Sequence, residues 1–482
     1  MMFQLDLMVV VPLLLAGACL IAGRMWPSAA RWIALTAVAV QVALLASMSS
    51  AGVFHGTRIL GLKPHVGAAV WGLAIDGLSM PLIALTVFIG GAAIFASWNV
   101  HDRPATHFAL LLAIQASVSA VFLADSLILF YVAWECVLIP MYFLIGGWGS
   151  SNRRHAAAKY LIYLFAAGAF MLVGLIFAII EAGGEGSIAA IAADPSVLVT
   201  PQLVFWLFMI TFLAKVPVVG LHTWLPDAHT EAPTAGSIVL AGVLLKMGGY
   251  GILRIAIPFA PQAFMQARIA LAVIGVVGII YGAAMALTQS DLKRLVAYSS
   301  VAHMGFVVLA IAAATPAAFA AAMIAMISHG LVAGLLFFLV GSLYDRAHTR
   351  ELAQFGGLGS VIPVWSVVFV FASLASLGLP GLSGFPGEFV SVIESFSAIG
   401  AWTAVAMIGL VLGAAYNLRA VRGTVQGPVG AFDSLPDLGA RELTLVAAFC
   451  AGIIVVGLQP TLVARVSEQF FAALSHLLTG GA

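Results

Sequence analysis

Charged residues are scarce in this sequence of 482 residues. Aspartate, glutamate, lysine and arginine together make up 8% of the chain, whereas a soluble domain carries about 25%. This deficit excludes an ordinary soluble globular protein. The 20 basic residues nearly balance the 19 acidic ones and form no basic tract, so the composition gives no indication of a nucleic-acid partner.

Cysteine and glycine-rich nucleotide loops are also lacking. The three cysteines, Cys19, Cys136 and Cys450, all lie in apolar runs, which argues against disulfides and metal clusters. The sequence has no GxGxxG loop for a dinucleotide and no cysteine spacing typical of an iron–sulfur cluster. We therefore expect no redox cofactor or metal to be bound by this chain.

Apolar sequence is what the chain has in abundance. Hydrophobic residues make up 63% of it, and about fourteen stretches approach the ~20 residues that a helix needs to cross a bilayer. The first stretch, "LMVVVPLLLAGACLIAG", lacks a basic region before it, so we interpret it as a retained helix and not a signal peptide. The sequence thus predicts an all-α polytopic membrane protein. The expected spans are residues 5–23, 30–48, 77–97, 106–124, 126–147, 156–180, 202–229, 233–256, 267–288, 293–313, 316–344, 362–393, 400–421 and 442–460.

The basic residues outside these spans predict the orientation in the membrane. Cytoplasmic loops carry an excess of lysine and arginine. One set of alternate loops and helix ends holds Arg24, Arg31, Arg103, Arg153, Arg154, Lys159, Lys293, Arg294, Arg346, Arg350, Arg419, Arg422 and Arg441, and the other holds Arg58, Lys63, Arg254, Arg268 and Arg465. The larger set should be cytoplasmic, which places both termini on the opposite side of the membrane.

Four charged residues lie well inside expected spans, away from the span ends: Glu135, Lys215, Lys246 and Glu388. A charge at the bilayer centre costs about 2.5–3.5 kcal/mol on insertion scales, so such residues usually face the protein interior or a water-filled cavity. The alternative is a structural role, either as a buried ion pair between helices or as a side chain that reaches the membrane surface.

Lys215 lies at an expected helix break. In "AKVPVVGLHTWLPDAHTEAPTAG", Pro217 removes one backbone donor and crowds the preceding turn. The freed backbone groups need protein or water partners, which indicates a polar pocket at that depth. We therefore interpret Lys215 as a protonatable group at a hydrated break, whose charge depends on a nearby carboxylate.

A second break precedes Glu388. The stretch "SLGLPGLSGFPGEF" places four glycines and two prolines between apolar runs. Paired broken helices in two halves of a transporter indicate inverted repeats with an ion site near the membrane midplane. We expect N-terminal helices over residues 1–105, five-helix repeats over 106–256 and 267–421, and a C-terminal helix and tail over 442–482. A nearby cation such as Lys246 would control the proton affinity of Glu388.

Two histidines inside spans suggest a proton relay. His303 and His329 have side chains that can exchange protons near neutral pH. We expect both, with Lys246, to lie along a hydrated track between Lys215 and Glu388, with gaps that water can bridge. The alternative for each is a core histidine bonded to a backbone carbonyl.

Four long stretches resemble one family. "WECVLIPMYFLIGGWG", "KVPVVGLHTWLPDAHTEAPTAGSIVLAGVLLKMGGYGILR", "QSDLKRLVAYSSVAHMGF" and "SHGLVAGLLFFLVGSLYDRAHTRE" are similar to the antiporter-like subunits of respiratory complex I. The resemblance implies fourteen helices with two inverted five-helix repeats. Glu135, Lys215 and Lys246 match the family's charged positions in the fifth, seventh and eighth helices. Glu388 matches the M (chain 4) type, because the L and N types and the related Na+/H+ antiporter subunits generally carry lysine there.

The resemblance implies a proton-translocating membrane subunit of NADH–quinone oxidoreductase, a translocase without a redox centre of its own. FMN and iron–sulfur clusters would belong to partner subunits, which include the L-type and N-type subunits, in the bacterial inner membrane. No long helix is expected after residue 460, which also disfavours the L type. Two alternatives stay open. One is a subunit of a multi-subunit Na+/H+ antiporter or membrane-bound hydrogenase, and the other is a membrane scaffold whose charges are only buried pairs.

Overall fold

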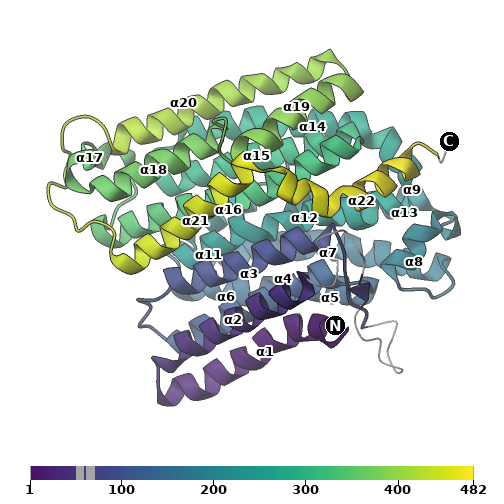
Figure 1. Cartoon of the computed structure of the whole chain (residues 1–482), viewed down its shortest axis with the longest axis horizontal. Coiled ribbons are helices and arrows are strands. Elements are labelled where there is room, and N and C mark those ends of the chain that lie inside the picture. Colours follow the sequence, from purple (N-terminus) through teal and green to yellow (C-terminus); the bar gives the residue numbers. More distant parts are fainter. Residues whose placement is uncertain (1, 50–58, 61–70, 481–482) are drawn as a thin grey trace. The chain divides into compact units, whose positions relative to one another are not determined.

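The computed structural model describes residues 2–49, 59–60 and 71–480, and these are mostly helical (Figure 1). Twelve helices among them are long and apolar enough to cross a membrane. Two short strands, Ile59–Leu60 (β1) and Ala74–Ile75 (β2), pair antiparallel with Ile59 opposite Ile75. The expected class, an all-α polytopic membrane protein, is confirmed. The count of fourteen spans and the two inverted repeats stay predictions.

The chain forms two compact units. The first unit comprises Met1–Val216, Val243–Arg268 and Arg465–Ala482, and the second comprises Pro217–Gly242 and Ile269–Ala464. Helices of the first unit are α1 (Met2–Met25), α2 (Ala29–Ser49), α3 (Ser79–Ala96), α4 (Pro104–Leu123), α5 (Leu127–Cys136), α6 (Leu138–Trp148), α7 (Arg153–Glu181), α8 (Ile188–Ala193), η2 (Pro195–Val197), α9 (Pro201–Lys215), α12 (Leu245–Gly251), η4 (Ile252–Ala256) and α13 (Ile257–Phe259).

Helices of the second unit are α10 (Trp224–Glu231), α11 (Thr234–Val239), α15 (Leu292–Ala313), α16 (Pro316–Ala347), η5 (Leu352–Gln354), α17 (Leu358–Val361), α18 (Pro363–Ser376), α19 (Gly384–Ile399), η6 (Ala401–Val405), α20 (Ala406–Thr424) and α21 (Ala440–Leu458). Three helices cross a boundary between the units: η3 (Leu240–Leu244), α14 (Pro261–Thr288) and α22 (Thr461–Leu478).

The helix starts follow from local sequence. Proline is favoured at the first helical position because its missing N–H would have no partner there. Among the described helices, proline opens five of 14 residues or more, at Pro104, Pro201, Pro261, Pro316 and Pro363. The side-chain oxygens of Ser126, Asp291 and Thr315 cap α5, α15 and α16 by accepting a backbone N–H of the first turn.

Both expected helix breaks are present. The first lies between α9, which ends at Lys215, and α10, which begins at Trp224, and the second lies between α18 and α19. Gly378 and Gly381 in the second break have φ values of 79° and 92°. This left-handed region favours glycine, because a Cβ would be strained there. The glycine-rich sequence therefore permits the sharp reversal before Glu388.

The segment 217–242, which the sequence assigned to the first five-helix repeat, packs within the second unit. The division of the chain into repeats stays a prediction. Within the second unit, the ring of His229 stacks on Phe337 with centroids 4.4 Å apart. The Lys293 ammonium also donates to the carbonyl of Ala232. These contacts join residues far apart in the sequence, so the spacing of spans gave no sign of them.

A further helix follows the last expected span. The sequence predicted a tail after residue 460, but Thr461–Leu478 is helical (α22). Its apolar residues recur along one face only, with Val466, Phe471 and Leu474 buried and Arg465 and Glu468 exposed. An amphipathic helix lacks the continuous apolar run by which spans are recognised, which is why the sequence reading missed it.

Candidate functional site

Lys215 is fully buried at the end of α9, in the first unit. Its Nζ lies 5.5 Å from the ring centroid of Trp134 and 6.0 Å from that of Tyr160. Electron-rich ring faces attract a cation at such distances. The α9 helix is fixed against α7 by a hydrogen bond from the Thr211 hydroxyl to the Ala167 carbonyl, 2.6 Å long. The ammonium group of Lys215 thus lies near two aromatic rings.

Glu135 projects from α5 toward α7. A Cβ added at Gly168 of α7 would collide with the Glu135 carboxylate, so the glycine leaves room for this side chain. The two charges, Glu135 and Lys215, attract each other electrostatically. Among the described residues, however, neither carboxylate oxygen of Glu135 has a hydrogen-bond partner, and Nζ of Lys215 has none either.

This arrangement argues against a structural salt bridge. A buried ion pair repays its desolvation only with close geometry and further hydrogen bonds, and buried polar atoms without partners are uncommon outside functional sites. The interacting pair that the sequence predicted therefore consists of neighbouring charges without direct contact in this structure.

Lys246 is fully buried on α12, between two π-helical segments, η3 and η4. π-helical turns inside α-helices are rare and are frequent at functional sites. The helix packs closely on the end of α9, because a Cβ at Gly248 would lie 2.6 Å from the Phe212 carbonyl oxygen and from the Val216 side chain. The glycine thus brings the helix of Lys246 against the helix of Lys215.

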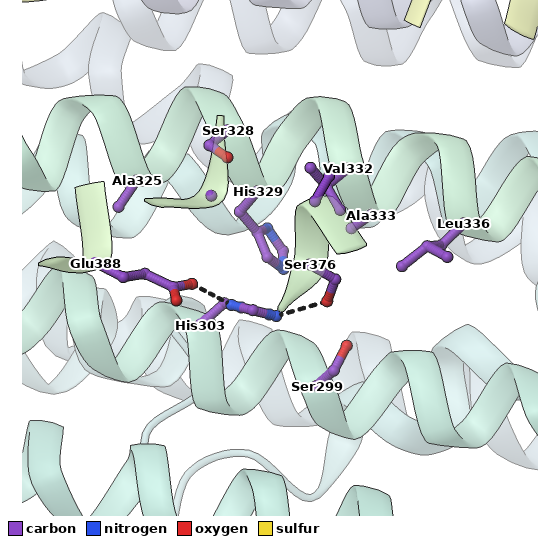
Figure 2. A pocket seen from close by; sticks show the side chains of 12 residues that line it. Ser299, His303, Ala325, Ser328, His329, Val332, Ala333, Leu336, Ser376 and Glu388 are labelled. Carbon is purple, nitrogen blue, oxygen red and sulfur yellow. Dashed lines mark hydrogen bonds and ion pairs between the residues drawn. The ribbon is translucent and has the colours of Figure 1, made fainter. Parts of the chain in front are cut away.

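The second unit contains a small cavity between α15, α16, α18 and α19 (Figure 2). Its volume available to the centres of water molecules is about 20 Å³, enough for at least one ordered water. The polar residues on its wall are Ser299, His303, Ser328, His329, Ser376 and Glu388. Three of the predicted site residues therefore meet at one cavity.

His303 and Glu388 are in direct contact. Nδ1 of His303 lies 2.5 Å from Oε1 of Glu388, and the two side chains are 14% and 9% exposed. This distance is that of a short hydrogen bond. The α19 helix is close enough for this contact because Gly387 packs on the α16 backbone, where a Cβ would lie 2.7 Å from the nitrogen of Ala325.

The second ring nitrogen of His303, Nε2, contacts residues that the sequence reading did not select. Nε2 lies 3.1 Å from the Ser376 hydroxyl and 3.2 Å from the Tyr416 hydroxyl. Asn417 donates to the same serine at 3.4 Å. Polar residues within an expected span could have indicated these contacts, since Tyr416 and Asn417 are adjacent in the apolar stretch "GLVLGAAYNLRAV". Serines in apolar runs are too common to single out Ser376.

His329 lies on α16 with its ring centroid 5.7 Å from that of His303. It is 6% exposed and points into the cavity in Figure 2. The group in contact with Glu388 in this unit is therefore His303. That Lys246 lies near Glu388 stays a prediction. That Lys246, His303 and His329 form a continuous track with Lys215 stays a prediction.

The positions of the two histidines predict an order of mutational effects. We expect His303→Ala to lower proton translocation more than His329→Ala, because Nδ1 of His303 is in direct contact with the Glu388 carboxylate at 2.5 Å. Both should be milder than Lys215→Ala, since water can replace one member of a relay. Initial rates of proton uptake by inverted membrane vesicles, normalised to the amount of assembled protein, would test this order. An equal loss in both histidine variants would contradict it.

Comparisons with known proteins place these sites in a family context. Residues 124–413 match the family model described as NADH:quinone oxidoreductase/Mrp antiporter, TM. The chain is 41% identical to NAD(P)H-quinone oxidoreductase chain 4 1 of Synechococcus sp. (strain JA-3-3Ab), over 98% of this chain and 93% of that protein. It is 38% identical to NADH-quinone oxidoreductase subunit M of Pseudomonas aeruginosa, over 98% and 99%.

A solved structure agrees with these relatives. The fold matches a chain of the respiratory complex I from Thermus thermophilus with bound NADH at a TM-score of 0.89 and 26% identity. The match covers 98% of this chain and 99% of that chain.

Proposed function

We propose that this chain, which belongs to the NADH:quinone oxidoreductase/Mrp antiporter family, is the M-type proton-translocating membrane subunit of an NADH–quinone oxidoreductase. The observation that carries the proposal is a set of acid–base side chains inside an apolar helical bundle, of which Lys215, Lys246 and Glu388 are buried and the others partly buried. Glu135, Lys215 and Lys246 lie in one unit, and His303 and Glu388 lie in the other. Intramembrane ionisable residues of this kind mark ion pathways.

In this function the protein moves protons and does not carry out the redox reaction. NADH oxidation and quinone reduction occur in partner subunits, where we expect FMN and the iron–sulfur clusters. The L-type and N-type membrane subunits are the expected neighbours. The driving reaction must therefore reach this chain as a change in conformation or charge, and the enzyme as a whole is a translocase.

The Glu135–Lys215 site supplies the charge-dependent step. Lys215 holds a proton more strongly when a carboxylate approaches and less strongly when it withdraws. Because the two groups share no hydrogen bond, a small movement of α5 or α9 changes their attraction without breaking a fixed ion pair. Lys215 then transfers its proton to Lys246 on the adjacent helix.

The His303–Glu388 site supplies proton loading and release. An imidazole and a carboxylate in contact can share a proton. The adjoining cavity admits water, which connects the pair to His329. We infer that Glu388 exchanges protons with the side of the membrane opposite the cytoplasm, and that both termini lie on that side.

The main alternative is a subunit of a multi-subunit Na+/H+ antiporter or a membrane-bound hydrogenase. The carboxylate at Glu388 disfavours the antiporter, since the related antiporter subunits generally carry lysine at the twelfth helix. The two candidate functions can be distinguished by experiment, because an antiporter subunit would exchange Na+ without NADH.

Deletion of the gene and complementation test the proposal. Inverted vesicles from the deletion strain should lose NADH-driven acidification, and the intact gene should restore it in Na+-free buffer. Purified NADH–quinone oxidoreductase from the complemented strain should contain this chain, as identified by mass spectrometry. Unchanged acidification after deletion, together with loss of Na+-dependent exchange, would establish the antiporter alternative instead.

A further inference from the structure

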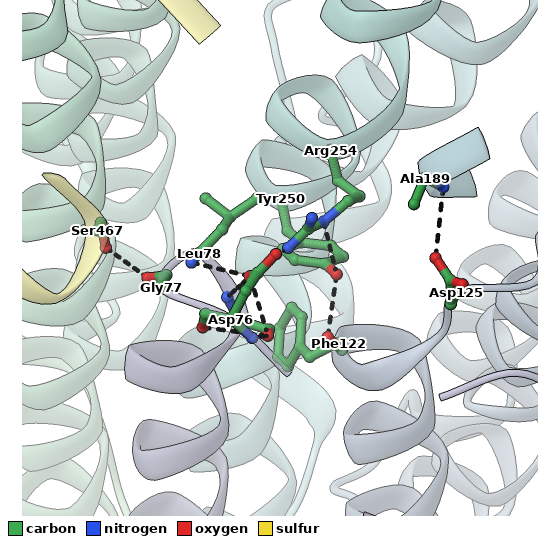
Figure 3. Close-up of polar contacts among 10 residues, drawn as sticks. Asp76, Gly77, Leu78, Phe122, Asp125, Ala189, Tyr250, Arg254 and Ser467 are labelled. Carbon is green, nitrogen blue, oxygen red and sulfur yellow. Dashed lines mark hydrogen bonds and ion pairs between the residues drawn. The ribbon is translucent and has the colours of Figure 1, made fainter. Parts of the chain in front are cut away.

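Asp76 and Arg254 form a buried ion pair in the first unit (Figure 3). Arg254 lies on the same helical span as Lys246, Thr234–Phe259. Nη2 of Arg254 is 2.5 Å from Oδ1 of Asp76, and the side chains are 14% and 10% exposed. Neither residue belongs to the acid–base groups described above. A buried pair of this kind is weak evidence for stability, because its desolvation cost offsets its attraction, and setting a register is its best-attested use.

Asp76 is fixed at the start of α3. Its Oδ1 accepts the backbone N–H groups of Leu78 and Ser79, at 3.0 and 3.2 Å. Burial alone would raise the pKa of this carboxyl, but the Arg254 guanidinium and the two N–H groups outweigh it and lower the pKa below its ordinary value. Asp76 is therefore held in its ionised form beside Arg254 at neutral pH.

Arg254 is held from several sides. Its Nε donates to the Tyr250 hydroxyl at 3.2 Å, and that hydroxyl donates to the Phe122 carbonyl of α4 at 2.9 Å. The Phe470 ring of α22 covers the guanidinium, with its centroid 4.8 Å away. The Ser467 hydroxyl of α22 donates to the carbonyl of Gly77, next to Asp76, at 2.6 Å.

The position of Arg254 in the helix gives these contacts a consequence for Lys246. Arg254 lies within the π-helical segment η4, whereas Lys246 and Tyr250 lie on α12, directly before it. A π-helical turn contains one residue more than an α-helical turn, and one residue corresponds to about 100° of rotation in an α-helix. If η4 relaxed to α-helix with Arg254 fixed, Lys246 would turn by about that angle around the helix axis.

We propose that the Asp76–Arg254 ion pair is a positioning device, which holds η4 in its π-helical register and thereby keeps Lys246 directed into the proton pathway. The proposal rests on the function proposed for Lys246. A π-helical turn is less favourable than an α-helical one and persists only where its surroundings hold it. Arg254 and Tyr250, fastened to α3, α4 and α22, are the side chains that hold it.

The test combines pumping with the helix register in the whole purified complex. Arg254→Gln and the isosteric Asp76→Asn remove the pair, Arg254→Lys retains the charge, and Arg103→Gln breaks the exposed Asp102–Arg103 pair of the same unit as a matched control. The protons translocated per NADH should fall in the first two, since misplacement of a transfer group slows the step by up to ~10²-fold. Arg254→Lys should retain part of the ratio, and Arg103→Gln all of it.

The structure of each assembled variant separates positioning from general destabilisation. We expect η4 to become α-helical and Lys246 to change direction in Asp76→Asn. A variant with η4 and Lys246 unchanged would overturn the proposal, whatever its pumping. Lys246→Ala tests the underlying function by itself. Normal pumping in Lys246→Ala would remove Lys246 from the proton pathway. If the register were still shifted in Asp76→Asn, the ion pair would remain the determinant of the register.

Discussion

Replacement of Glu135 by glutamine is expected to reduce proton pumping to near background while the complex still assembles. The amide keeps the size of the side chain but removes the charge that attracts Lys215. The carboxylate makes no hydrogen bond among the described residues, so its loss should leave the packing of α5 and α7 intact. Loss of a positioned acid–base group typically costs ~10²-fold or more in rate. NADH-driven acidification of inverted vesicles, at matched complex content, is the measurement.

The aspartate variant supplies the matched control for this prediction. Glu135→Asp retains the charge with a shorter reach, and Gly168 leaves space around the carboxylate, so it should lose less activity than Glu135→Gln. A scaffold whose charges only stabilise packing would behave differently, because the double variant Glu135→Gln and Lys215→Ala would still pump. Wild-type pumping in Glu135→Gln membranes would rule out the role assigned to this residue.

The membrane spans and both helix breaks could be predicted because each depends on a local pattern. Apolar length defines a span, and proline or clustered glycine ends a helix. The break after Lys215 and the reversal at Gly378 and Gly381 follow directly from these local patterns. The buried charges were predictable for the same reason, since a lysine or glutamate inside an apolar run stands out without any knowledge of its neighbours.

The partners of those charges were not predictable. His303 and Glu388 are 85 positions apart, and their contact depends on how α19 packs on α15 and α16. The sequence therefore selected both residues but did not pair them with each other. The Ser376 and Tyr416 hydroxyls on the far side of the imidazole depend on the same packing. Long-range neighbours of this kind are set by tertiary structure and leave no periodic signal in one sequence.

The two π-helical segments around Lys246 are a third feature that the sequence did not show. A π-helical turn is one inserted residue within a helix, and neither η3 nor η4 contains a proline. Its position depends on contacts outside the helix, such as the ion pair between Asp76 and Arg254. Functional sites are where local preference and final structure commonly disagree.

Glu388→Ala is expected to suppress proton translocation strongly in a complex that still assembles. The substitution removes the carboxylate that lies 2.5 Å from Nδ1 of His303. The imidazole is left beside Ser376 and Tyr416, which are poor proton carriers near neutral pH. Glu388→Gln, which keeps the volume and one hydrogen bond to His303, should be equally defective if the proton matters and nearly normal if only packing does. Glu388→Lys should retain part of the activity, because a protonatable group remains at the break and related subunits carry lysine there. Proton uptake per NADH in reconstituted, fully assembled complex decides between these outcomes, and near-normal uptake in Glu388→Ala would leave Glu388 with a structural role only.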